Sequence, residues 1–293
     1  MQKQLAVGAD VGGTHITAAL VDPESKEMIA ESVSRISTTE NSGVDELIEA
    51  WSRCIAEAMG KHEVSKVCLA MPGPFNYHAG ICLIKDQNKY PGLYGVNVRQ
   101  RLAERLGISP EDIYMNNDAG CFLQGEVFCG SLTDFRNVIG VTLGTGLGTA
   151  VCKDHEANSA DLWNMPFRDS IAENYISSNW FIKTFNERTG RNIKGVKELV
   201  GMYDREPLAK ELFNEFGKNL GLFLNTFIKL HRPEAVVIGG NIANALPLFE
   251  KTMKAQIVNN HPDVVIRQSV HGENAALIGA VGSWFTRETA TSF

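Results

Sequence analysis

The residues of this chain best suited to chemistry are an acid and the glycines beside it. Asp10 follows a short apolar run and precedes Gly12 and Gly13, in "VGADVGGTHITAALVD". Such a turn lets backbone N–H groups approach phosphate oxygens, because no Cβ atom holds the backbone away. Asp10 would then orient Mg²⁺ through its water ligands, since Mg²⁺ prefers one or two carboxylates together with substrate phosphates. The alternative is a tight hairpin turn that happens to contain an acid.

The same pattern occurs again in "NVIGVTLGTGLGTAVCK". There Gly144, Thr145 and Gly146 lie between two apolar runs. At both places a buried strand is predicted to enter the turn and to leave it as another strand. The Walker and dinucleotide-binding loops are therefore excluded, because both lead into a helix. Thr14 and Thr145 can add hydroxyl donors to the backbone N–H groups.

A third glycine turn follows a buried strand at 236–238. It consists of Gly239, Gly240 and Asn241 and leads towards a helix. One such turn alone is weak evidence, but two phosphate-type hairpins and a third turn together predict a nucleotide held in a cleft between two lobes.

Phosphoryl transfer also needs a group that orients the acceptor hydroxyl and takes its proton. Asp118, in the segment "NNDAGCFLQGEVFCG", is the candidate for this base. The alternative is that Asn117 or Asp118 only caps the helix that follows, a role that both residue types favour. The two roles are compatible.

Apolar spacing predicts the elements that position these residues. The strand at 66–71 stops at a Pro-Gly-Pro loop that includes Pro72 and Gly73, at the carboxyl end where open α/β sheets place their ligands. Further strands are predicted at Leu5–Ala9, Ile16–Val21, Met28–Val33 and Asp112–Met115, and helices at Val44–Met59, Val98–Leu106, Pro207–Leu230 and Asn274–Phe285.

Composition limits the classes of protein to consider. The chain has 293 residues, 44% of them apolar, and 34 acids against 28 bases give a net charge of −6. We expect a globular α/β protein with no nucleic-acid partner, since no basic run is present, and no membrane span. Without an evident export signal it is expected to be cytoplasmic, with its six cysteines as reduced thiols because no CxxC pair is present.

Together these motifs resemble the ROK family of sugar kinases and sugar-responsive repressors, within the superfamily of hexokinase and actin. The resemblance runs over nearly the whole chain. It is carried, in the family's order and spacing, by "GADVGGTHITAALVD", "MPGPFN", "NNDAGCFLQGE", "TLGTGLGTAV" and "VVIGGNIA". It implies an α/β fold of two actin-like (ribonuclease H-like) lobes, with a cleft for nucleotide and sugar between them. The lobes are expected at 1–116, joined by the C-terminal helix at 274–293, and at 117–273.

The resemblance also implies an activity and roles for single residues. The activity is ATP- and Mg²⁺-dependent phosphorylation of a hexose or N-acetylhexosamine hydroxyl, by a homodimer. Asp118 would be the catalytic base, and Asn117 with the Pro-Gly-Pro loop would contact the sugar. Asn88 falls near the family's sugar-contacting asparagine. Glu126 matches the glutamate that closes the Asn-Asp helix, with a packing or solvated carboxylate as the alternative.

One region departs from the family pattern. Family members usually carry a Gly-His segment and a cysteine-rich zinc motif, whereas residues 159–178 contain no cysteine. Asn164 stands where the zinc- and sugar-binding histidine would be, and an amide is a poor zinc ligand. We therefore expect no structural zinc. Glu173 still fits the family's sugar-binding glutamate, with a helix-terminal acid as the alternative.

Other functions remain to be weighed. A sugar-sensing repressor would carry a DNA-binding segment before the first turn, which begins near residue 1 here. A non-catalytic sugar-binding regulator is consistent with the altered region at 159–178 but not with the retained catalytic set. A kinase for a small carboxylate is disfavoured by the Pro-Gly-Pro and Asn-Asp motifs. His15 could touch phosphate or be an ordinary half-buried histidine, and Trp163 could line the sugar pocket, although core packing is favoured.

Overall fold

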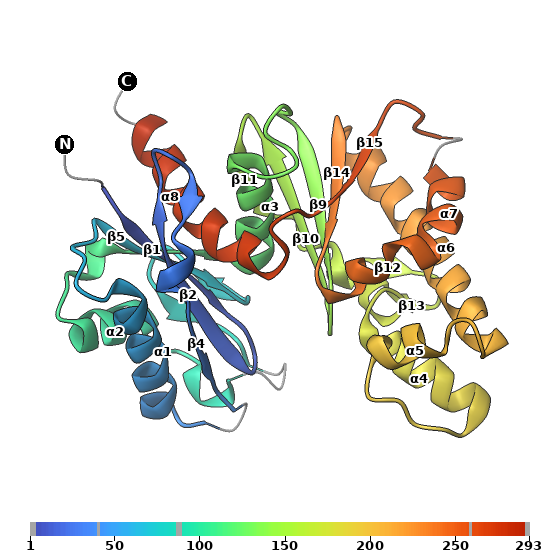
Figure 1. Cartoon of the computed structure of the whole chain (residues 1–293), viewed down its shortest axis with the longest axis horizontal. Coiled ribbons are helices and arrows are strands. Elements are labelled where there is room, and N and C mark those ends of the chain that lie inside the picture. Colours follow the sequence, from blue (N-terminus) through green and yellow to red (C-terminus); the bar gives the residue numbers. More distant parts are fainter. Residues whose placement is uncertain (1–3, 40–41, 86–89, 258–259, 291–293) are drawn as a thin grey trace.

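Two mixed β-sheets form the centres of the two lobes (Figure 1). The computed structural model describes residues 4–39, 42–85, 90–257 and 260–290. The first sheet has the strand order β3-β2-β1-β5-β8, with β4 paired to β2, and the second has the order β11-β10-β9-β14-β15. The strands are β1 Ala6–Val11, β2 His15–Asp22, β3 Glu27–Met28, β4 Ser34–Ser37, β5 Lys66–Met71, β8 Ile113–Asn117, β9 Val138–Leu143, β10 Leu147–Lys153, β11 Glu156–Ser159, β14 Ala235–Gly239 and β15 Val265–Gln268.

The two sheets share one topology. In each, an antiparallel hairpin (β1–β2 or β9–β10) is followed by two strands parallel to its first strand (β5 and β8, or β14 and β15). Because parallel strands end at the same edge of a sheet, each lobe gathers the loops after its parallel strands at one edge. Two-stranded pieces β6–β7 (Phe75–Asn76, Ile81–Cys82) and β12–β13 (Pro166–Phe167, Ser170–Ile171) lie outside the main sheets.

Helices cover both faces of each sheet, and apolar side chains fill the spaces between. On the first sheet, α1 and α2 cover one face and α8 the other. On the second, α4, α6 and α7 pack against one face and α3 against the other. The helices are α1 Val44–Met59, α2 Val98–Leu106, α3 Asp118–Phe128, α4 Ser178–Thr189, α5 Val196–Met202, α6 Pro207–His231, α7 Leu246–Ile257 and α8 Ala275–Ala290. None of the helices in the described ranges is long and apolar enough to cross a membrane.

Two helices join the lobes, and each follows a strand of one sheet but packs on the other sheet. Helix α3 follows β8 of the first sheet but packs on the second, and α8 follows β15 of the second sheet but packs on the first. The two helices cross in close contact, because a Cβ atom at Gly279 would lie 1.7 Å from the backbone oxygen of Cys121. Only glycine permits this approach.

One predicted strand is wrong. Met28–Val33 was expected to be extended, but only Glu27–Met28 pairs as a strand, and Ala30–Ser32 forms a 3₁₀ turn. The Ser32 hydroxyl accepts a hydrogen bond from the Leu20 backbone N–H at 2.8 Å and donates one to the Ile29 carbonyl oxygen at 2.6 Å. The Ser32 hydroxyl thus takes the place of a backbone acceptor from a neighbouring strand, and pairing with β2 resumes in β4.

Candidate active site

The first glycine turn joins β1 to β2. Val11 and Ile16 are the last paired residues, and the Gly12 N–H donates to the His15 carbonyl oxygen at 2.9 Å. The buried Tyr90 hydroxyl donates to the Gly12 carbonyl oxygen. A Cβ atom at Gly13 would meet no atom within 4 Å, so the outer side of this turn is open to a ligand.

The second turn joins β9 to β10 and has a carboxylate against it. Leu143 pairs with Leu147, and the Gly144 N–H donates to the Gly146 carbonyl oxygen at 3.1 Å. The Leu147 N–H donates to Glu173 Oε2 at 2.9 Å. The same oxygen would lie 2.4 Å from a Cβ atom at Gly146, so glycine at this position leaves room for the carboxylate.

The third turn lies directly beside the second. Strand β14 runs parallel to β9, with Gly239 opposite Thr142. Gly240 has φ +81°, and a Cβ atom there would lie 2.5 Å from the Leu143 carbonyl oxygen. Asn241 is exposed and begins a short 3₁₀ helix, Asn241–Ala245. The second and third turns therefore form one surface at the edge of the second sheet.

Asp10 and Asp118 share the electrostatic environment at the edge of the first sheet. Asp10 lies beside Ala70 of β5, which in turn lies beside Asn116, two residues before Asp118. The pKa of Asp10 is raised to about 7, mainly by burial and then by the negative charges of Asp118 and Glu273, while the charge of Arg35 lowers it. A carboxyl group with so high a pKa is expected where a cation or a proton is needed.

Asn117 begins α3 and contacts the Pro-Gly-Pro loop. Its Oδ1 accepts hydrogen bonds from the Ala119 and Gly120 N–H groups at 3.0 and 3.2 Å, so the capping role is observed. Its Nδ2 donates to the Tyr77 hydroxyl at 3.1 Å, and a Cβ atom at Gly73 would lie 3.0 Å from that hydroxyl. The Pro-Gly-Pro loop and the start of α3 are thus joined as one unit.

The approach of α3 to the second hairpin brings the two lobes together at Asp118. A Cβ atom at Gly148 of β10 would lie 3.2 Å from the Cβ atom of Ala119, the residue after Asp118. Asp118 itself is half-buried, and its Oδ1 accepts a hydrogen bond from the Ala119 N–H at 2.8 Å. The proposed base therefore lies between the first turn and the second hairpin.

Three other predicted positions can be placed in the structure, and a fourth cannot. Asn88 lies outside the described residues. Asn164 is exposed at the end of a short 3₁₀ helix, Leu162–Asn164, and Trp163 packs against the core of the second lobe. Pro72 is buried directly after β5, at the edge shared with Asp10.

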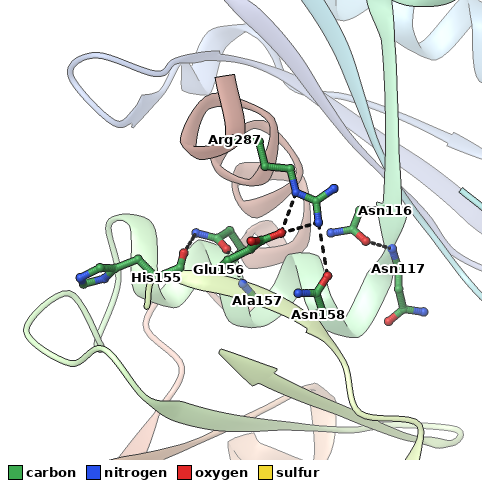
Figure 2. Close-up of polar contacts among 8 residues, drawn as sticks. Asn116, Asn117, His155, Glu156, Ala157, Asn158 and Arg287 are labelled. Atoms are coloured by element: carbon green, nitrogen blue, oxygen red, sulfur yellow. Dashed lines mark hydrogen bonds and ion pairs between the residues drawn. The ribbon is translucent and has the colours of Figure 1, made fainter. Parts of the chain in front are cut away.

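A polar cluster behind Asn117 ties β11 to both connecting helices (Figure 2). Arg287 of α8 donates from Nε to Glu156 Oε1 at 2.8 Å, and the buried Gln124 of α3 donates to the His155 carbonyl oxygen at 3.0 Å. Gln124 also accepts from the Ala157 N–H at 2.9 Å. In the same view Asn116 accepts a hydrogen bond from the Asn117 N–H at 2.9 Å. Strand β11 is thus held to α3 through Gln124 and to α8 through Arg287.

Sequence reasoning left the role of Glu126 open, and the structure resolves it. The buried carboxylate accepts hydrogen bonds from the Ser131 hydroxyl at 2.7 Å, the Ser269 hydroxyl at 2.7 Å, and the N–H groups of Val270 and His271 at 3.1 and 3.2 Å. Burial opposes the charge, but these bonds outweigh it and lower the pKa of Glu126. It anchors the loop before α8 to the end of α3, so the alternative of a solvated carboxylate is excluded.

Metal ligands and thiols can be considered from the described part of the chain. There, no group of three His, Cys, Asp or Glu side chains is placed to hold a metal ion. Mg²⁺ in a phosphoryl-transfer site needs fewer protein ligands, because waters and phosphates complete its shell. The raised pKa of Asp10 fits such a site, since a divalent cation would offset the carboxylates around it. The six cysteines are free thiols, as expected.

Comparison with known proteins places this geometry in a family. The model of the ROK family matches residues 6–159 and 169–287. An N-acetyl-D-glucosamine kinase of Haemophilus influenzae is 23% identical over 96% of this chain and 99% of its own. A ROK family glucokinase of Streptomyces griseus, solved with glucose and AMPPNP, superposes with a TM-score of 0.78 at 21% identity, over 94% of this chain and 97% of its own.

A structure of a ROK family transcriptional regulator, a homologue of the E. coli MLC protein, has a TM-score of 0.77 at 17% identity. That alignment covers 96% of this chain and 78% of the regulator. At such identities the likeness shows the fold, which confirms the predicted α/β fold of actin-like lobes.

Proposed function

The chain belongs to the ROK family, and from this premise we propose that it is an ATP-dependent sugar kinase with Asp118 as its catalytic base. The observation that carries the proposal is the position of Asp118: it lies at the start of α3, in the electrostatic field of Asp10 and close to the second hairpin. A carboxylate between two open glycine turns can receive a proton from a hydroxyl as that oxygen attacks a phosphoryl group.

On the donor side, the three glycine turns would hold the nucleotide. Gly12, Gly13 and Thr14 would face the terminal phosphates, and Gly144, Thr145 and Gly146 would contact them from the other lobe, with backbone N–H groups as donors. Gly239, Gly240 and Asn241 would lie on the adenosine side. Support comes from the open space at Gly13 and from the adjacency of the second and third turns.

Asp10 would hold Mg²⁺, through water, close to those phosphates. The cation supplies charge that offsets the developing negative charge on the transferred group. The half-buried Asp10 and Asp118, with the exposed Glu273 nearby, are the part of the structure that fits this requirement.

On the acceptor side, Asn117, Pro72 and Gly73 would form the wall against which the sugar lies. Glu173 would approach the sugar from the second lobe, and its contact with the Leu147 N–H already ties it to the nucleotide side. Asn164 and Asn88 are retained as proposed sugar contacts of the same pocket. Closure of the lobes would exclude water, so that transfer to the sugar competes with ATP hydrolysis.

The acceptor class we propose is a hexose or an N-acetylhexosamine. Support comes from the relatives, which include an N-acetyl-D-glucosamine kinase and a Listeria innocua beta-glucoside kinase, the latter 24% identical over 95% of this chain and 97% of its own.

The experiment is a coupled assay of ADP release with MgATP and a panel of glucose, mannose, fructose, allose, N-acetylglucosamine and N-acetylmannosamine. Mass spectrometry of the product identifies the phosphorylated sugar. ADP release that depends on one of these sugars supports the proposal. If a sugar binds in calorimetry but no member of the panel is phosphorylated, the protein is a sugar-binding regulator instead.

A further inference from the structure

A cation missed by the sequence analysis lies beside the first turn. Arg35 is in β4, and the strand register places Arg35 opposite Thr17 and Thr17 opposite Asp10. Residues directly opposite one another on neighbouring strands point to the same face of a sheet. Arg35 and Asp10 therefore share a face, and Arg35 is the cation that counteracts the neighbouring acids at Asp10.

Hydrogen bonds connect Arg35 to the turn itself. Arg35 Nη2 lies 3.0 Å from His15 Nε2, and His15 Nδ1 lies 3.1 Å from Thr14 Oγ1. A guanidinium group only donates, so Nε2 accepts, and the proton of the neutral imidazole is assigned to Nδ1 from its partners. His15 then donates to Thr14, whose own hydroxyl proton is left to bond an incoming acceptor.

The charges around the turn require such a cation. Asp10, Asp118 and Glu273 are all acids of this site, and a nucleoside triphosphate would bring further negative charge. The Arg35 guanidinium bonds Glu273 Oε2 at 2.9 Å, with 49% and 61% of the two side chains exposed. An ion pair so exposed is weak, and guanidinium binds phosphate as a bidentate donor. The guanidinium can therefore exchange Glu273 for a phosphate.

We propose that Arg35 binds the terminal phosphate of the nucleotide, and that Glu273 holds the guanidinium until the phosphate arrives. The inference rests on the proposed use of ATP. The competing view is that the Arg35–Glu273 pair only links β4 to the loop before α8. The two views predict different changes in nucleotide affinity. If the pair is only structural, substitution of Arg35 or of Glu273 should change the affinity in the same direction. If Arg35 binds phosphate and Glu273 competes for it, the two substitutions should change the affinity in opposite directions.

The test is isothermal titration of the full chain with the magnesium complexes of AMPPNP and ADP, and with AMP, in the absence of sugar. The variants are Arg35→Gln, Arg35→Lys and Glu273→Gln. Arg188→Gln is the matched control, because Arg188 pairs with Glu211 and Glu215 in the second lobe. Melting temperatures of all variants are recorded in parallel.

We expect Arg35→Gln to weaken AMPPNP binding about 10- to 100-fold and AMP binding less than about twofold, because the lost bonds are charge-assisted and reach only the terminal phosphate. Arg35→Lys should recover part of the affinity. Glu273→Gln should strengthen AMPPNP binding roughly threefold, since a competitor and a repulsive charge are removed. The control should match the wild type.

Three outcomes would overturn the inference. They are an unchanged AMPPNP affinity in Arg35→Gln, an equal loss for AMP, and weaker AMPPNP binding in both Arg35→Gln and Glu273→Gln. Wild-type protein that binds none of the three nucleotides would contradict the proposed use of ATP as well, whereas wild-type binding with an unaffected Arg35→Gln contradicts only this inference.

Discussion

The two hairpins occupy the same place in two sheets of the same topology, yet they carry different side chains. Asp10 and Thr142 are equivalent: each lies one residue before the last paired residue of the first hairpin strand. The second lobe folds with threonine there, so the fold does not require an acid at this position. The Asp10 carboxylate is half-buried near Asp118 and Glu273, at a cost that its raised pKa reflects, and we propose that it is retained there to hold Mg²⁺.

The two turns also differ in the number of charged side chains described around them. The first turn lies among Asp10, Asp118, Glu273 and Arg35. The second turn is contacted by the Glu173 carboxylate, which accepts a backbone hydrogen bond. In the proposed kinase the first hairpin would control charge at the transferred phosphoryl group, and the second would supply backbone donors and a link to the sugar side.

The largest effect on activity is expected from substitution at one of the two equivalent positions, Asp10 and Thr142. Asp10→Asn should lower kcat/KM for MgATP about 100-fold or more, because the metal loses its protein partner. Thr142→Val, at the equivalent position, should change it by less than about threefold. Steady-state kinetics at saturating sugar measures both. Equal losses of kcat/KM in the two variants would contradict the proposal that the first hairpin, through Asp10, has a catalytic role that the second hairpin lacks.

Ionisation of Asp10 should also change the free energy of unfolding with pH. Its pKa is raised from 3.8 to about 7, so the folded state binds a proton that the unfolded state has released, and stability falls as pH rises from about 4 to 7. Without Mg²⁺, Asp10→Asn should be more stable than the wild type at pH 8, by roughly 2–4 kcal/mol, and equal to it below pH 4. Urea unfolding across pH measures the difference; a wild type that is the more stable at pH 8 would contradict the raised pKa.

The Glu126 carboxylate, which anchors the loop before α8 to the end of α3, should give the opposite pH dependence of stability. Glu126 has a lowered pKa, so it contributes stability above its unfolded-state pKa and loses it as pH falls through the lower folded value. Glu126→Gln should cost about 1–3 kcal/mol at pH 7, because the bonds from Ser131 and Ser269 lose their charged acceptor. Thermal unfolding tests this, with the solvent-exposed Glu198→Gln as control. Equal melting temperatures of wild type and Glu126→Gln at pH 7 would contradict the anchor.

The smallest effects are expected from alanine substitution of one glycine in each of the first two turns. Gly13→Ala should raise the Kd of AMPPNP about tenfold with no loss of stability, since the methyl group enters only the open space where phosphate would lie. Gly146→Ala should instead displace Glu173, 2.4 Å away, and so raise the KM of the sugar as well. If Gly13→Ala binds AMPPNP as the wild type does, the first turn is not a phosphate site.

Local patterns in the sequence predicted much of this architecture. Helix α1 was predicted with its observed bounds, Val44–Met59, because its apolar spacing is regular. In the structure the Gly43 N–H at its start donates to the Glu46 carboxylate. Both strand-turn-strand hairpins were also predicted and are confirmed. Glycines at the ends of buried runs are local signals that need no knowledge of the rest of the chain.

What could not be predicted depends on distant parts of the chain. The partners of Glu126 at Ser269 to His271 are more than 140 residues away, and Arg35 reaches Glu273 across 238 residues. The strand expected at Met28–Val33 failed because one serine hydroxyl bonds the backbone there. The proposed sugar contacts at Asn88, Asn164 and Glu173 stay predictions, since they come from the family resemblance. Asn164 and Glu173 also lie at 159–178, where the sequence departs most from the family pattern.

The most direct measurement of the central claim is single-turnover transfer from ATP to the sugar that the panel identifies, in wild type and Asp118→Asn, with AMPPNP affinity determined on the same samples. Asparagine keeps an oxygen that can accept the Ala119 N–H, so the helix start should be retained. We predict that transfer slows by about 10²- to 10⁴-fold while the AMPPNP Kd changes less than about threefold. Transfer at the wild-type rate in Asp118→Asn would contradict the assignment of the catalytic base.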